Sequence, residues 1–90
     1  METDIKLSYK DERELTELSA LVSKCETTKR RLQEALTDPD AYAKDPEAYA
    51  RTAADLAETQ RILLAAEERW LELEARREAL MARRDKGKEG

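Results

Sequence analysis

The stretch TDPDAYAKDP, residues 37–46, decides the fold because it holds both prolines of the chain. Each proline follows an aspartate; proline removes a helical hydrogen-bond donor and disfavours helical geometry in the residue before it. Residues 45–47 (Asp-Pro-Glu) make a good helix start, with an N-cap side chain, a proline at the first helical position and an acid near the positive end of the helix dipole. Residues 38–40 (Asp-Pro-Asp) can begin one short turn through Ala43 by the same logic. We therefore predict a connector at residues 38–45 between two helices.

Long helices are predicted on both sides of this connector, at residues 9–37 and 46–84. Ser8 and Asp11 fit a capping box at the start of the first. Positions spaced alternately by three and four residues are mostly apolar in both helices, which is the 3.5-residue period of a left-handed coiled coil. In the first helix these seam positions are Leu15, Leu18, Val22, Cys25, Lys29, Leu32 and Leu36. In the second they are Tyr49, Thr52, Leu56, Thr59, Leu63, Ala66, Trp70, Leu73, Arg77 and Leu80.

A short connector makes neighbouring helices antiparallel, so residues that face each other have position numbers with a constant sum. A sum of 88 pairs an a-type with a d-type seam position in every layer, for example Leu18 with Trp70 and Lys29 with Thr59. We therefore predict an all-α fold, a two-helix antiparallel coiled-coil hairpin. Trp70 is predicted to be a core anchor, with base stacking as the alternative. Lys29 is predicted to snorkel from the seam, with a phosphate contact as the alternative.

The composition agrees with long helices and excludes most other classes of protein. Charged residues make up 42% of the 90 residues and aromatic residues 4%, with two glycines and two prolines. A β-sandwich or barrel needs more β-branched and aromatic residues and more turns. With no His, one Cys and glycines only at positions 87 and 90, the chain lacks zinc sites, Cys–His nucleophiles and glycine-rich phosphate loops. We predict no catalytic residue, no metal ligand and no cofactor in this chain.

Several further expectations follow from the sequence. The lone Cys25 has no disulfide partner, which suits a reducing cytoplasm. No apolar run approaches the roughly 20 residues of a membrane span, so no membrane contact is expected. Residues 1–8 are predicted to be a lead-in without a secretory signal, and residues 85–90 a disordered polar tail. A single thin seam gives little burial for so many ordered residues, so we expect a second copy, a partner or a parent protein to stabilise the hairpin.

The charges are unevenly distributed although the net charge is −4. The connector is acidic, whereas cations gather in the middle of the first helix and near the end of the second. The candidate nucleic-acid-binding residues are Lys24, Lys29, Arg30, Arg31, Arg61, Arg76, Arg77, Arg83 and Arg84. The alternative is a solvated face with local ion pairs, such as Glu26 with Arg30 and Glu72 with Arg76. Any binding is expected to be directed at the phosphate backbone and to weaken steeply with salt.

Three stretches resemble a known family: KLSYKDEREL at residues 6–15, DPDAYAKDPEA at residues 38–48, and RWLELE at residues 69–74. Over about residues 6–75 the chain is similar to the C-terminal domain of Uup-type ABC-F proteins, duplicated ATP-binding cassette proteins without membrane domains. Members often carry Leu-Pro near the start of the first helix, where this chain has Leu18-Ser19.

The resemblance implies an antiparallel coiled coil that follows the second ATPase cassette and is associated with DNA binding. ATP and magnesium would belong to the cassettes of the parent protein, which is expected to be a cytoplasmic ATPase. Three functions stay open: an accessory domain that binds structured or duplex DNA, a module that contacts the cassettes or the ribosome and modulates ATP turnover, and a plain self-association coiled coil that forms a homodimer.

Overall fold

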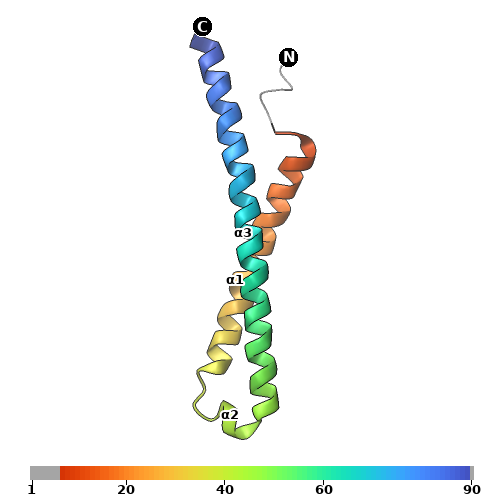
Figure 1. The fold of residues 1–90 in the computed structure, drawn as a ribbon, viewed down its shortest axis with the longest axis vertical. Helices are drawn as coiled ribbons and strands as arrows, with labels where there is room; N and C mark the ends of the chain where they lie inside the picture. The colour runs from red at the N-terminus through yellow and green to blue at the C-terminus, as the bar shows by residue number, and fades with distance from the viewer. Residues whose placement is uncertain (1–6, 90) are drawn as a thin grey trace.

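The computed structural model describes residues 7–89, with side chains up to residue 83, as three helices. They are α1 (Tyr9–Leu36), α2 (Ala41–Lys44) and α3 (Pro46–Glu89). The two long helices run antiparallel and contact each other, and α1 crosses from one side of α3 to the other along the shaft (Figure 1). The molecule is a rod of 69 × 21 × 14 Å. The predicted all-α helical hairpin is thus confirmed.

Helix α1 begins and ends with side-chain caps. Ser8 is the N-cap residue, and its Oγ accepts a hydrogen bond of 3.1 Å from the backbone N–H of Asp11. At the other end Thr37 is the C-cap residue, and its Oγ1 donates to the carbonyl oxygen of Glu34 over 2.7 Å. The capping box therefore forms on its serine side, whereas the Asp11 carboxylate bonds to α3, as described below.

Aspartates organise the connector. The Oδ1 atom of Asp38 accepts a hydrogen bond from the N–H of Asp40 at 3.0 Å, so the chain turns directly before the short helix α2. Asp45 is extended, with φ of −157°, and its Oδ1 accepts from the N–H of Ala48 at 3.1 Å. This is the N-cap geometry that satisfies an otherwise unpaired donor in the first turn of α3. The short helical turn predicted in the connector is present and reaches Lys44.

The far end of α3 differs from the sequence prediction. The helix continues to Glu89, whereas we predicted that it ends at residue 84 and that a disordered tail follows. No proline lies beyond Pro46, and the single Gly87 costs only about 1 kcal/mol relative to alanine, which good helix formers on either side can offset. Residue 90 and residues 1–6 of the predicted lead-in lie outside the described residues.

The buried core follows the predicted seam and concentrates where α1 begins. The buried residues are Leu7, Leu15, Cys25, Leu63, Ala66 and Leu73. Leu15 and Leu73 share one cluster, as the register predicts, and Leu18 and Trp70 pack against it. Leu7, which we predicted only as part of the lead-in, also belongs to this cluster. None of the described helices is both long enough and apolar enough to pass through a membrane.

Candidate nucleic-acid interface

The first group of predicted site residues lies in the middle of α1. Lys24, Arg30 and Arg31 are exposed, and Lys29 is half-buried at its seam position. Within residues 7–83, where side chains are described, no ion pair or side-chain hydrogen bond involves these four residues. Their charges are thus available to a ligand.

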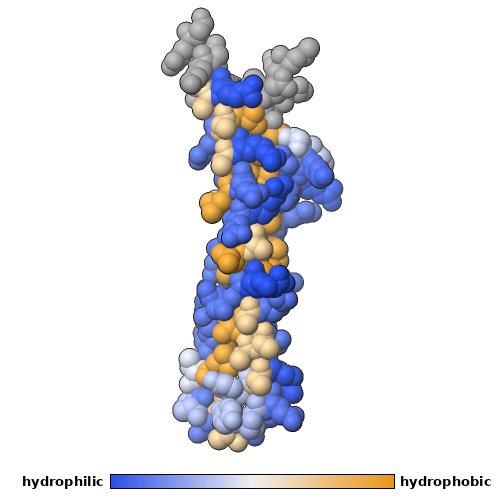
Figure 2. All heavy atoms as spheres, in the orientation of Figure 1, coloured by the Kyte–Doolittle hydropathy of each residue, from blue (hydrophilic) through white to orange (hydrophobic). Residues whose placement is uncertain are grey.

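These cations do not form a single strip along α1. Lys24 and Arg31 are seven residues apart, which places them on the same side of the helix. Arg30 lies about 100° further round, because successive helical residues rotate by that angle. Figure 2 shows hydrophilic residues over most of the shaft, with apolar patches between them. The helix can therefore present at most two of the exposed cations, Lys24 and Arg31, squarely to one flat ligand.

Arg61, on the facing helix, is held by its own neighbour. Its Nη2 donates to Oε2 of Glu58 at 3.0 Å, three residues earlier on α3. This hydrogen bond lowers the pKa of the Glu58 carboxyl and raises that of the Arg61 guanidinium. A phosphate that approached Arg61 would have to compete with this carboxylate.

The cations near the open end of the hairpin, where α1 begins beside α3, are also largely paired. Arg76 donates from Nη1 to Oδ2 of Asp11 across the two helices at 2.6 Å. The Nη1 of Arg77 lies 3.3 Å from Oε1 of Glu74. Arg83 is exposed, and the side chain of Arg84 lies outside the described residues. Pairing therefore removes Arg76 and Arg77 from the strongest candidates.

Neither of the two local ion pairs expected from the sequence forms among the residues whose side chains are described. Glu72 accepts from Nη1 of Arg69 at 2.9 Å and not from Arg76. The expected pair of Glu26 with Arg30 is absent from the part of the chain whose side chains are described. The i,i+4 rule accounts for neighbours on one helix, but Arg76 has a partner on the other helix, which the rule does not consider.

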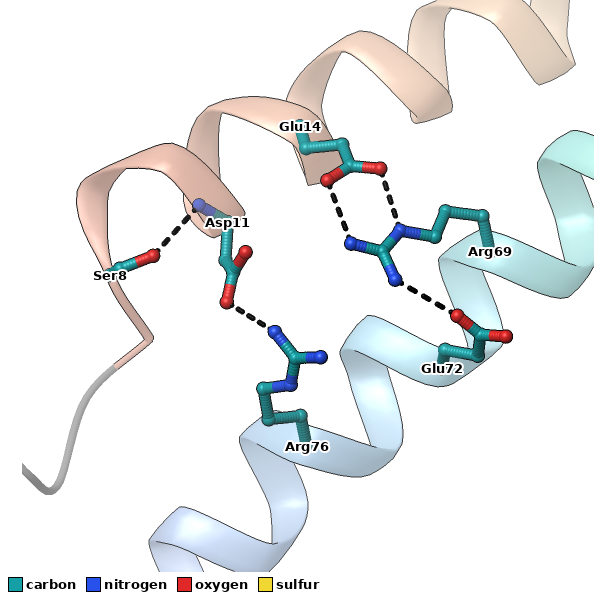
Figure 3. A network of polar contacts seen from close by, with 6 residues as sticks. All are labelled: Ser8, Asp11, Glu14, Arg69, Glu72 and Arg76. Atoms are coloured by element: carbon teal, nitrogen blue, oxygen red, sulfur yellow. Dashed lines mark hydrogen bonds and ion pairs between the residues drawn. The ribbon is translucent and has the colours of Figure 1, made fainter.

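The strongest polar contact between the helices was missed by the sequence analysis (Figure 3). Arg69 donates from Nε to Oε2 of Glu14 at 2.7 Å and from Nη2 to Oε1 at 3.1 Å, a bidentate pair. These hydrogen bonds lower the pKa of the Glu14 carboxyl, and those to Glu14 and Glu72 raise the pKa of Arg69. Glu14 and Arg69 each precede a predicted seam position, and that flanking placement is the signal that could have found them.

The arrangement can attract a polyanion but shows no means of reading its sequence. The exposed cations supply Coulomb attraction and hydrogen-bond donors for phosphate oxygens. Trp70, the candidate for base stacking, is half-buried and packed against the Leu15–Leu73 cluster. Among the described residues no group of His, Cys, Asp or Glu side chains is placed to hold a metal ion.

Comparison with known proteins gives one family. A family model described as "ABC transporter C-terminal domain" matches residues 6–75. No curated protein and no solved structure gave a match. The matched region contains the three caps, the connector and every buried residue described above.

Proposed function

The chain belongs to the family of ABC transporter C-terminal domains, and from this we propose that it is the accessory domain of a Uup-like ABC-F ATPase and binds DNA through its phosphate backbone. The parent protein would act in the cytoplasm, and its cassettes would bind ATP and magnesium. The domain itself would bring a structured or duplex DNA close to them. The family match supports the role as an accessory domain. The proposed binding of DNA rests on the charged side chains at the surface.

The observation that carries this argument is a set of exposed cations on α1 that have no ion-pair partner among the residues whose side chains are described. We name Lys24, Arg30 and Arg31 the basic cluster. An arginine already paired with a carboxylate gains little from phosphate, because the first contact must be broken. An unpaired exposed cation loses no such contact, and it releases counterions from the DNA when it binds. The binding should therefore depend on the basic cluster far more than on Arg61, Arg76 or Arg77.

Labelled duplex and branched DNA titrated at two salt concentrations tests this proposal. The variant Lys24→Glu/Arg30→Glu/Arg31→Glu should abolish binding at low salt. A matched control, Lys44→Glu/Arg51→Glu, changes exposed cations close to the acidic connector and should bind like the original chain. Each phosphate contact should contribute about −0.9 to the slope of log K against log salt, so the two cations that share one side of α1 give an expected slope of about −2. Equal affinities for the two variants would overturn the proposal.

A second candidate function, contact with the cassettes or the ribosome, is favoured by apolar side chains that face solvent. Leu64 and Leu71 lie seven residues apart on α3 and are 59% and 60% exposed. Such a pair on one side of a helix is a common anchor for another protein surface. Replacing both by serine should change the parent's ATP turnover or its ribosome association without changing DNA affinity. A homodimer through the same residues would instead appear as a concentration-dependent mass in sedimentation.

A further inference from the structure

Two adjoining hollows lie along the contact between α1 and α3 beside Trp70, the only tryptophan of the chain. The first, of about 270 Å³, is lined by Ser19, Val22, Glu67 and Trp70. The second, of about 430 Å³, shares Ser19 and Trp70 with the first and extends toward the first turns of α1. Because the hollows share these two residues, we treat them as one feature, the Trp70 groove.

Small residues explain why the seam is not filled here. Ser19 lines the first hollow together with Trp70, and the buried Ala66 lies about one helical turn before Trp70 on α3. An indole ring next to two small side chains leaves space that neither helix can close, so the ring stays half-buried. Apolar atoms that entered the groove would gain contacts that the seam itself does not supply.

The walls of the groove are acidic. Glu12, Glu67 and Glu74 line it against one cation, Arg77, which lies 3.3 Å from Oε1 of Glu74. That Oε1 atom is shielded from solvent and accepts no hydrogen bond from the described residues. The Arg77 guanidinium is near this oxygen but does not donate a hydrogen bond to it, so a ligand donor that reached the oxygen would add a hydrogen bond. The same carboxylates repel phosphate, which separates the groove from the basic cluster.

We propose that the Trp70 groove binds a cationic amphipathic helical segment of a partner protein, with an apolar side chain against Trp70 and Val22 and a Lys or Arg paired with Glu67 and Glu74. Three features select this occupant. A helix laid against the contact between α1 and α3 presents side chains at regular intervals to the residues that line the groove. The aromatic face attracts a cation as well as an aliphatic side chain. The excess of carboxylates in the groove requires positive charge in the partner.

Trp70 emission provides a direct test, since no other tryptophan contributes. The probe is a synthetic helix of about 18 residues, roughly five turns, with leucines along one face and arginines beside them. A matched peptide carries glutamate in place of each arginine. The arginine peptide should shift and saturate the Trp70 emission at near-physiological salt, and the glutamate peptide should leave it unchanged.

Paired variants assign the binding to the groove. Glu67→Gln/Glu74→Gln keeps the shapes of the side chains and should weaken the arginine peptide about tenfold, in line with the loss of two partly exposed ion pairs. The matched control Glu68→Gln/Glu78→Gln removes two exposed carboxylates of α3 that do not line the groove, and should bind as the original chain does. The basic-cluster variant should not weaken the arginine peptide, whereas it should abolish DNA binding, and this distinguishes the two experiments.

Three outcomes would overturn the proposal: no change in Trp70 emission, equal binding of the two peptides, or equal weakening by the two double variants. The last would show that the peptide responds to net charge alone. Circular dichroism of each variant establishes that the hairpin is folded, so that lost binding is not mistaken for unfolding.

Discussion

The open end of the hairpin and its tip, the connector at residues 37–45, are stabilised by different means. At the open end the buried leucines Leu7, Leu15 and Leu73 join the helices, and two ion pairs cross between them. At the tip every side chain of α2 is exposed or half-buried, and the polar contacts lie within a few residues of each other in sequence. One end is thus held by tertiary contacts and the other by local ones.

The covalent connection explains this difference. The short connector keeps the last turn of α1 and the first turn of α3 close together even when few contacts form, because closing a short loop costs little entropy. At the open end no such link exists between the two helices, so they would separate there unless side chains hold them. The bidentate Glu14–Arg69 pair joins the helices near this open end, where their separation would begin.

Removing the central leucine of the open end should have the largest effect. Leu73 is fully buried, and Leu73→Ala should lower the free energy of unfolding by about 2–5 kcal/mol through lost burial and the cavity left behind. Leu71→Ala, at a neighbouring position 60% exposed, should change it by less than about 0.5 kcal/mol. Thermal melts followed by circular dichroism measure both.

A third variant measures how much a seam residue near the tip contributes to the free energy of unfolding. Leu56→Ala removes a half-buried seam residue closer to the connector, and should cost less than Leu73→Ala. Equal costs at the two positions would show that the seam stabilises the hairpin uniformly and that the contrast between its ends is wrong.

Removing a helix cap tests the same comparison of the two ends, with expected losses of about 1 kcal/mol in the free energy of unfolding. Asp45→Ala removes the N-cap of α3, and because few other contacts hold the tip, the full cost of about 1–2 kcal/mol is expected. Ser8→Ala removes the N-cap of α1 and should cost about 0.5 kcal/mol, since Leu7 and the Asp11–Arg76 pair still hold that turn. Denaturant titration gives both values, and amide hydrogen exchange shows where the helix frays. A larger loss for Ser8→Ala would contradict this assignment.

The tip was predicted almost to the residue because its determinants are local. Asp38, Asp45 and Pro46 act on their immediate neighbours, and the structure has the turn and the cap that these residues imply. The seam was predictable for a related reason, since the alternation of apolar residues repeats along the whole helix. Local chemistry and periodicity together were enough for the hairpin.

The candidate site was harder to predict because the availability of a charge depends on its partner. Counting cations placed Arg76 beside Lys24 and Arg31 as equal candidates, yet Arg76 is paired with Asp11, 65 positions earlier in the chain. Such a contact depends on the side of the seam from which each side chain projects and on the length of that side chain. The spacing of residues along the sequence does not give either. The burial of Leu7 was also missed, because Leu7 precedes α1 and the apolar repeat of the helix does not include it.

Acid should destabilise the open end more than the tip. We expect this change in stability to be smaller than those of the substitutions above. The hydrogen bonds from Arg69 lower the pKa of Glu14 in the folded chain below its ordinary value of 4.5. A carboxyl with a lowered folded pKa stabilises the fold fully above its unfolded pKa, and this contribution is lost as the pH falls through the folded value. Melting temperatures of the original chain should therefore decrease from about pH 5 downward, and those of Glu14→Gln should decrease less.

Glu58→Gln is the matched control for this experiment. The pKa of Glu58 is also lowered by an arginine, but its partner Arg61 lies on the same helix, so the pair does not join α1 to α3. Both variants should reduce the dependence of melting temperature on pH, because each removes one carboxyl with a lowered pKa. Only Glu14→Gln should also speed amide exchange in the first turns of α1 at neutral pH, since only that pair holds the two helices together where no connector does. Equal exchange in the two variants would mean that the buried leucines and the Asp11–Arg76 pair hold the open end without Glu14.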